Sequence, residues 1–352
     1  MTAGVTDTFG SASHALLCRV VRRTLAVSLA VSILGPLVCL VVYARLDYGR
    51  RLADVDSILV DLSRVSEEHA LRLFDLNAAI MARALELLGD RTREEIRQRE
   101  PQIHRRLEAF VNGYPQIASL SVFGAAGDLI ASSRYSPPPA VAIADRGDFN
   151  VASPWYSHPY ISLPLYRRID GETVLVSSVG RASDGNWSLG IVSVALRRKY
   201  LIDFYTRVVG SRPGYTVSLY RREGAAVLAS SSPDSRPDGL GHNPDFTQAL
   251  RENVVYGSFR QEERGPGRNL LVSFRRVGDY PVYVVSSFDL DELRRAWLRG
   301  LAVLSFVTLI PGVIVCTWMS ILLVRLRANE AQQSGGPAVC DAPRLTEQEG
   351  EA

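Results

Sequence analysis

The stretch Ile117-Ala-Ser-Leu-Ser-Val-Phe123, continued after a turn by Leu129-Ile-Ala-Ser-Ser133, decides the fold of this chain. After Pro115 the hydrophobic period changes to two, which is the period of a β-strand. Residues 124–128, between the two runs, contain two glycines and an aspartate, which favour a turn. The stretch therefore predicts a β-hairpin.

The same pattern recurs about a hundred residues later. Tyr215-Thr-Val-Ser-Leu-Tyr220 and Val227-Leu-Ala-Ser-Ser231 restate the hairpin, including its final Ala-Ser-Ser. A second echo, at a similar offset, pairs Val174-Leu-Val-Ser-Ser178 with the run that begins Leu270-Leu-Val-Ser-Phe274. Two echoes in the same order predict two small α+β units in tandem.

A long helix is predicted ahead of the first unit, from Leu46 to Leu88, with Gly89 as its stop. Its residues recur at steps of three and four, close to a heptad seam. The seam consists of Leu52, Val55, Leu59, Leu62, Ser66, His69, Leu73, Leu76, Ile80 and Leu87. It predicts a homodimer through this helix, with packing on the following domain as the alternative. We interpret His69 as a packed histidine, because no second metal ligand stands at a helical spacing.

Further elements follow from local signals. Thr92-Arg-Glu-Glu95 has the form of a capping box that begins a second helical segment, which Pro101 breaks or restarts and Gly113 ends. Additional strands are predicted at 160–166, 173–181 and 187–196, and short amphipathic helices at 198–209 and 289–298.

Two apolar runs bracket this region. Thr24 to Ala44 has 21 residues without a charge, and Leu301 to Val324 has 24. About 20 apolar residues cross a hydrocarbon layer about 30 Å thick, so both runs predict membrane spans. Val42-Tyr43-Ala44 has the form of a cleavage site, but the first run is longer than a usual signal core, which favours an uncleaved anchor.

Composition and motifs exclude several functions. The formal charge of +3 is small and no basic stripe is present, so nucleic acid is not an expected partner. No cysteine falls between Arg45 and Gly300, which argues against disulfides or a zinc site there. Hydrolase, metalloprotease and phosphate-loop signatures are absent. We expect neither an enzyme nor a cofactor.

From residue 46 to 298, the chain resembles the tandem (double) Cache, PAS-like extracytoplasmic sensor domains of bacterial histidine kinases, diguanylate cyclases and chemoreceptors. Besides the long helix and the two hairpins, Asp145-Arg146-Gly-Asp-Phe149 is similar to the family's Asp-Arg-x-Tyr-Phe segment. Arg181, after Leu175-Val-Ser-Ser178 and before Asp184-Gly185, is similar to its Ser-Arg-Arg and Asp-Gly positions. The chain departs from the family at Asp148, where an aromatic is usual, and at Gly180, where a second arginine is usual.

The resemblance implies an α+β fold, with a long N-terminal helix and two PAS-like antiparallel sheets between two transmembrane helices. It also implies a membrane-distal unit that binds a small ligand, namely an amino acid, a carboxylate or an amine, and a membrane-proximal unit that relays binding. The expected organisation is a cytoplasmic tail (1–23), a transmembrane helix (24–44), a stalk and second helix (45–113), a distal unit (114–209), a proximal unit (210–298), a transmembrane helix (301–324) and a disordered cytoplasmic tail (325–352).

The ligand-binding candidates lie in the first unit. Arg146 and Arg181 could clamp one anion, because a guanidinium presents a fork of donors that matches a carboxylate; structural ion pairs with nearby aspartates are the alternative. Phe149, Trp155 and Tyr160 are candidates for the pocket wall, with core packing as the alternative. Ser178, on the strand that carries the resemblance, completes the set.

These observations predict a two-span protein of the bacterial inner membrane with a periplasmic sensor domain. The tail after the second span is too short for an output domain, so a separately encoded kinase or diguanylate cyclase is the expected partner. The alternatives are a non-sensory structural or assembly protein and a degenerate remnant of a sensor kinase or diguanylate cyclase.

Overall fold

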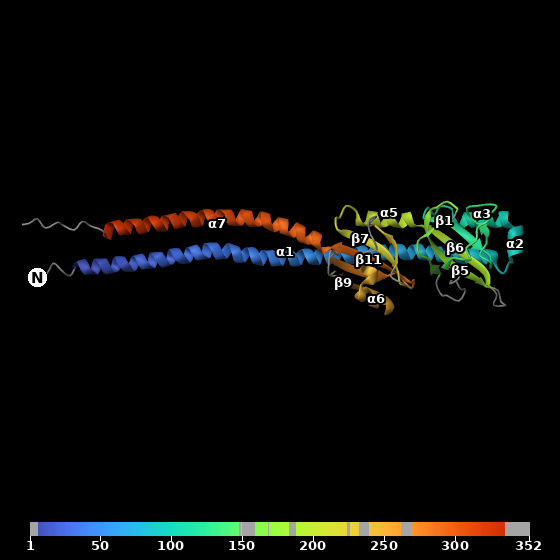
Figure 1. Ribbon diagram of the computed structural model, residues 1–352, viewed down its shortest axis with the longest axis horizontal. Coiled ribbons are helices and arrows are strands. Elements are labelled where there is room, and N and C mark those ends of the chain that lie inside the picture. Colours follow the sequence, from blue (N-terminus) through green and yellow to red (C-terminus); the bar gives the residue numbers. More distant parts are fainter. Residues whose placement is uncertain are drawn as a thin grey trace, which may run out of the picture. The chain divides into compact units, whose positions relative to one another are not determined.

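The computed structural model describes residues 6–147, 149, 159–167, 169–182, 188–223, 226–231, 239–261 and 269–334 (Figure 1). The chain forms two compact units. The terminal unit consists of Met1–Arg50 with Ala296–Ala352, and the central unit is Arg51–Arg295. Helices α1 (Thr6–Leu88) and α7 (Leu290–Ser334) contribute residues to both units.

The terminal unit contains two apolar helical stretches. Among the described residues, α1 and α7 are the helices long and apolar enough to cross a membrane, with mean hydropathies of 2.3 and 2.2 in their most apolar windows. Neither window is buried, and Val31 and Trp318 are 63% and 74% exposed. Apolar surface of this extent is expected in contact with lipid. The short helix predicted at 289–298 is the first part of the continuous α7.

In the central unit, α1 ends where the sequence predicts. Gly89 has φ of +50° and donates its N–H to the Leu85 carbonyl at 2.8 Å, a helix end that favours glycine. The predicted seam is buried within this chain at Val55, Leu59, Leu62, Ser66, Leu73 and Ile80. The seam therefore serves packing within the chain, which was the alternative. A homodimer stays a prediction and would have to use the exposed face of α1.

Two short helices follow. The capping box is confirmed: Thr92 Oγ1 accepts the Glu95 N–H at 3.4 Å, and Glu95 Oε2 accepts the Thr92 N–H at 2.7 Å. Helix α2 spans Arg93–Gln98, and α3 begins at Glu100, next to Pro101, and ends at Val111.

The first sheet has six strands in the order β2-β1-β6-β5-β3, with β4 also paired to β5. They are β1 (Ile117–Phe123), β2 (Leu129–Ser132), β3 (Tyr160–Ile161), β4 (Leu165–Tyr166), β5 (Thr173–Ala182) and β6 (Ser188–Arg197). The strand predicted at 160–166 is two short strands. Ser162 interrupts it by using its own hydroxyl to accept the Val176 N–H at 3.0 Å, and Pro164 has no N–H to pair.

Helix α5 (Arg198–Val209), which has the predicted bounds, leads to the second sheet. Its order is β8-β7-β11-β10-β9, the same as in the first sheet. The strands are β7 (Tyr215–Arg221), β8 (Ala226–Ser230), β9 (Tyr256–Gln261), β10 (Leu270–Arg276) and β11 (Val282–Asp289). The 3-10 turn η2 (Gly239–His242) and α6 (Pro244–Arg251) precede β9, and none of the three was predicted.

The repeated Ala-Ser-Ser has a shared structural cause. Ser133 donates its backbone N–H to the Leu120 carbonyl at 2.8 Å, and its hydroxyl accepts the Leu120 N–H at 2.9 Å. Ser231 makes the same pair of bonds with Val217, at 2.9 and 3.0 Å. Each hairpin therefore extends by one residue beyond its last strand pair, with a serine hydroxyl replacing a carbonyl.

One face of α1 packs against both sheets (Figure 1). Its buried side chains Phe74, Met81 and Leu88 belong to one apolar cluster that also contains Leu120 of the first sheet and Leu219 of the second. Burying each such side chain contributes about 1.5–3 kcal/mol. The helix is therefore the common core element of the two sheets.

Gly190 of β6 provides a test of the first sheet. Its φ is +104°, and an added Cβ would collide with the Phe123 carbonyl. We expect Gly190→Ala to destabilise the full-length protein by more than about 2 kcal/mol, measured by thermal unfolding in detergent. Gly171→Ala is the control, because Gly171 has φ of +70° but open space around it, and should cost about 1–2 kcal/mol. Equal losses for the two variants would contradict the close approach of β6 to Phe123.

His69 is packed, as interpreted, because its ring stacks on Phe204 of α5 with centroids 3.4 Å apart. Burial, with Arg207 and Arg72 nearby, lowers the pKa of His69 from 6.5 to about 4. Between these pH values the unfolded chain binds a proton that the folded chain does not, so stability falls as the pH drops from 6.5 towards 4.

We therefore expect His69→Phe, which keeps the stack, to reduce the fall in melting temperature between pH 7 and pH 4.5. Carboxylates titrate in the same range in both proteins, so the difference between variant and wild type isolates His69. Identical pH profiles would show that this histidine is not the group responsible.

Candidate functional site

A cavity of about 210 Å³ lies against the face of the first sheet that is turned away from α1. Successive residues of a strand point to opposite faces, and the strands divide accordingly. On β1, Ser119, Ser121 and Phe123 line the cavity, whereas Leu120 and Val122 pack in the cluster with α1. The remaining lining comes from Leu129, Ser132, Tyr135, Val141, Ile143, Arg146, Leu165, Tyr166, Arg167, Ile169, Val174, Val176, Ser193 and Ala195.

A row of serines crosses the sheet at this face. The strand register pairs Ser132 with Ser121, Ser121 with Ser193 and Ser193 with Ser178. The hydroxyls of Ser178 and Ser193 lie 2.9 Å apart, within hydrogen-bonding distance, and both side chains are buried. Ser178, a predicted site residue, is thus hydrogen-bonded to a cavity-lining residue but does not itself line the cavity.

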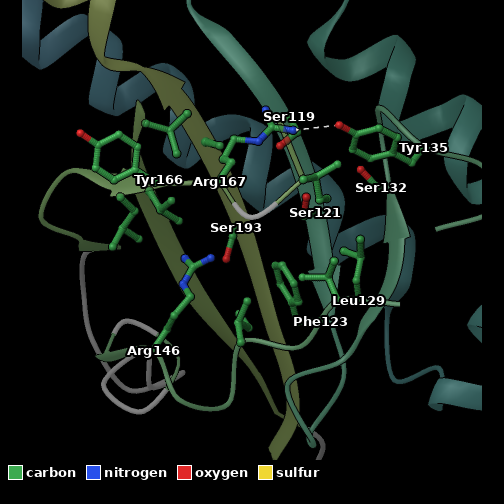
Figure 2. A pocket seen from close by; sticks show the side chains of 17 residues that line it. Ser119, Ser121, Phe123, Leu129, Ser132, Tyr135, Arg146, Tyr166, Arg167 and Ser193 are labelled. Carbon is green, nitrogen blue, oxygen red and sulfur yellow. Dashed lines mark hydrogen bonds between the residues drawn. The ribbon is translucent and has the colours of Figure 1, made fainter. Parts of the chain in front are cut away.

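Arg146 is the predicted site residue that lines the cavity. Its backbone N–H donates to the Ile143 carbonyl at 2.9 Å, which places it on the turn after the Pro137–Pro139 loop. Figure 2 shows its guanidinium pointing towards the hydroxyl of Ser193. The position next to Asp145 that the sequence singled out therefore brings a cation to the serine floor.

Arg167 also lines the cavity, and sequence reasoning missed it. Its side chain is 10% exposed and forms ion pairs with Asp170 at 3.4 Å and with Glu172 at 3.7 Å. Its Nη2 donates to the hydroxyl of Tyr135 at 3.5 Å (Figure 2). Strand alternation would not have found it, because the consecutive residues Leu165, Tyr166 and Arg167 all line the cavity.

Arg167 belongs to a charged cluster beside the cavity. Arg134 pairs with Asp170 at 3.2 Å and with Glu172 at 3.6 Å, and Arg197 pairs with Glu172. Three arginines thus share two carboxylates, so the cluster as a whole retains a positive charge. This edge of the cavity favours an anion.

Two predicted wall residues lie elsewhere. Phe149 packs with Phe123, Leu129, Ile143 and Ile191, and so supports the cavity wall from behind. The hydroxyl of Tyr160 accepts a hydrogen bond from Arg221 of β7 at 2.9 Å, and the guanidinium carbon lies 5.6 Å from the centre of its ring. Tyr160 therefore joins the first sheet to the second. Trp155, with Asp148 and Asp184, lies outside the described residues.

Arg181 does not join Arg146. It is an odd-numbered residue of β5, on the same face as Leu175, which packs in the cluster with α1, whereas the even-numbered Val174 and Val176 line the cavity. Arg181 is 3% exposed as a residue, and its guanidinium donates to the carbonyls of Gly89 and Arg91 at 3.3 and 3.0 Å, and to that of Leu189 at 3.3 Å. Burial lowers the pKa of Arg181, with Asp90 opposing the shift. Arg181 and Arg146 are not brought together, because the strand period of β5 directs Arg181 to the face that packs on α1, whereas Arg146 lines the cavity on the other face.

The equivalent face of the second sheet is filled. The register equates the serine row of the first sheet with Ser230, Ser218, Val285 and Phe274. Phe274 packs against Phe246 of α6, with ring centroids 5.8 Å apart, inside an aromatic cluster that also holds Tyr220 and Tyr283. Two serines of the first sheet are thus replaced by Phe and Val, and a helix covers the site.

Comparisons with known proteins support the fold. No protein-family model and no curated protein matches the sequence. The extracellular domain of rpHK1S-Z16, described as a histidine kinase, superimposes with a TM-score of 0.53 at 23% identity, covering 69% of this chain and 97% of that domain. The sensory domain of the Campylobacter jejuni chemoreceptor Tlp3, crystallised with isoleucine, gives 0.49 at 13% identity, covering 69% and 96%. The ligand-binding domain of the Pseudomonas fluorescens chemoreceptor CtaA with L-alanine gives 0.45 at 15%, covering 67% and 97%.

The chain therefore has the fold of extracellular sensor domains. Its two antiparallel sheets of matching strand order, with a long apolar N-terminal helix and an apolar C-terminal helix, form the α+β arrangement expected from the sequence. At this level of identity the similarity defines the fold alone and does not identify a ligand.

Arg181 gives a test that separates a structural arginine from a ligand-binding one. Arg181→Met removes the donor to three main-chain carbonyls, so we expect it to lower the free energy of unfolding by about 2–3 kcal/mol. Thermal unfolding of the full-length protein measures this loss. Arg83→Met, at an exposed position of α1, is the control and should stay within about 0.5 kcal/mol of wild type. An unchanged stability of Arg181→Met would contradict the structural role.

Proposed function

We propose that this protein is an inner-membrane sensor that binds a small periplasmic metabolite at the first sheet. The observation that supports this proposal is the cavity into which Arg146 and Arg167 bring guanidinium groups over a floor of serines. In this proposal the first sheet belongs to the membrane-distal unit (114–209), and the second to the membrane-proximal unit (210–298).

The cavity chemistry supports a small polar ligand. Guanidinium groups present N–H forks that match carboxylates, and serine hydroxyls both donate and accept. The apolar side chains of Val174, Val176 and Ala195 supply a wall for an aliphatic stem. The volume of the cavity, about 210 Å³, is below the roughly 300–1,000 Å³ of typical ligand pockets, which favours a small ligand. We therefore propose an amino acid, a carboxylate or an amine, with the arginines favouring a molecule that carries a carboxylate.

A route from the cavity to the second sheet supports a relay role. Ser193 at the cavity is hydrogen-bonded to Ser178, which pairs in register with Tyr160, and Tyr160 accepts the hydrogen bond from Arg221. A ligand shifts such contacts only through its different affinities for two states, with couplings of about 1–3 kcal/mol typical. We propose that the signal passes through the bilayer helices to a separately encoded kinase or diguanylate cyclase.

The test is a ligand screen on full-length protein in lipid nanodiscs. We expect members of a panel of amino acids, carboxylates and amines to raise the melting temperature, and Arg146→Gln to weaken the best compound about tenfold or more. Arg106→Gln, at an exposed position of α3, is the matched control and should bind as wild type.

A panel without any stabilising compound would count against the sensor and in favour of the alternative, a membrane structural or assembly protein. An Arg146→Gln variant that binds as tightly as wild type would move the binding site away from this cavity.

A further inference from the structure

We infer that the cavity of the first sheet selects a short dicarboxylate, an inference that rests on the proposed sensor function and narrows its ligand. The observation behind it is that two guanidinium groups reach the cavity from different segments and at different places. Figure 2 shows the guanidinium of Arg167 beside Ser119 and that of Arg146 beside Ser193. Each fork can take one carboxylate with two parallel hydrogen bonds.

One donor nitrogen of Arg167, Nη1, is without a hydrogen-bond partner among the described residues. It is buried and lies 3.7 Å from Glu172, which is an ion-pair distance but too long for a hydrogen bond. A buried donor without an acceptor costs about 1–3 kcal/mol, which an incoming carboxylate would recover. The charged cluster, with three arginines on Asp170 and Glu172, keeps an excess positive charge for it.

The surface of the sheet between Arg146 and Arg167 fits the middle of a short dicarboxylate. Ser119 and Ser121 are two residues apart on β1, a separation of about 7 Å along the strand. Ser121 pairs in register with Ser193, which Figure 2 places beside Arg146. The two cationic ends are therefore offset along the sheet, with serine hydroxyls between them. Val174, Val176 and Ala195 line the cavity in the same region and fit short methylene or hydroxymethylene carbons.

The second sheet lacks two serines of the row that crosses the first sheet. Phe274 and Val285 stand at the positions of Ser178 and Ser193, and α6 covers the face. Ser218 and Ser230 remain and hydrogen-bond to each other, but Phe274, Val285 and α6 fill the rest of the face and leave no arginine-lined cavity at these register positions among the described residues. The inference therefore applies to the first sheet alone.

The experiment compares ligands that differ in a single carboxylate. Binding of succinate, glutarate, butyrate and alanine to full-length protein in nanodiscs at pH 7.5 is measured by titration calorimetry. We expect a dicarboxylate to bind at least about tenfold tighter than butyrate and alanine, since one charge-assisted fork is worth about that factor. We expect Arg146→Gln and Arg167→Gln each to weaken the dicarboxylate to the level of butyrate, and butyrate to depend on only one of the two arginines.

Arg134→Gln is the matched control for Arg167. Arg134 pairs with the same Asp170 and Glu172 but is not among the cavity-lining residues, so its loss disturbs the cluster and leaves both cavity guanidiniums in place. Because it also removes the excess positive charge of the cluster, we expect a loss of dicarboxylate affinity that is clearly smaller than the loss caused by Arg167→Gln. If Arg167→Gln does not fold, Arg167→Lys keeps the charge and removes the fork, and the same loss of dicarboxylate affinity is expected.

The outcomes separate the two proposals. Tighter binding of alanine or butyrate than of either dicarboxylate overturns the inference and leaves the sensor function standing. Equal dependence of butyrate on both arginines also overturns it, because that would indicate a clamp on a single carboxylate. Failure of the whole metabolite panel to bind counts against the sensor function itself.

Discussion

The packing of one face of α1 against two sheets is the constraint on which the central unit depends. Residues from Leu62 to Leu88 bury their side chains in a cluster shared with β1, β6, α5, β7 and β11. Once each sheet has one face on the helix, its other face must be covered in some other way. The first sheet leaves that face with a cavity, and the second covers it with α6 and aromatic side chains. The difference between a sheet with a cavity and a sheet with a filled face follows from what is placed on these two outer faces.

The difference between the two outer faces comes down to a few positions in a shared register. Both sheets have the same strand order, and both hairpins end on a serine that pairs twice with the facing strand. Ser178 and Ser193 in one sheet correspond to Phe274 and Val285 in the other. Burying hydroxyls is favourable only if they find partners, and these two find each other at 2.9 Å. Phe274 and Val285 gain more apolar burial instead and fill the space.

Much of the fold could be predicted from local pattern, because hairpins, helix caps and amphipathic helices depend on residues that are close together in the sequence. The bounds of α5, the capping box at Thr92 and the hairpin repeat are examples. The site was harder, because it depends on which face of a strand a residue occupies. A motif suggested both Arg146, which lines the cavity, and Arg181, which the strand period directs to the opposite face of the sheet. Arg167 follows directly after the strand predicted at 160–166, and no sequence motif marked it. The heptad pattern of α1 is compatible with packing against a partner chain and with packing against the chain's own sheets, because either arrangement would bury the same side chains.

Strand β5 joins the cavity to the helix without an intermediate layer. Its even-numbered residues line the cavity or support its floor, and its odd-numbered Leu175 packs in the α1 cluster while Arg181 grips the carbonyls of Gly89 and Arg91 just past the end of α1. A strand is a single covalent layer, so its two faces move together. Any displacement of the cavity floor along β5 is therefore transmitted to the end of α1, so this strand couples the cavity mechanically to the helix.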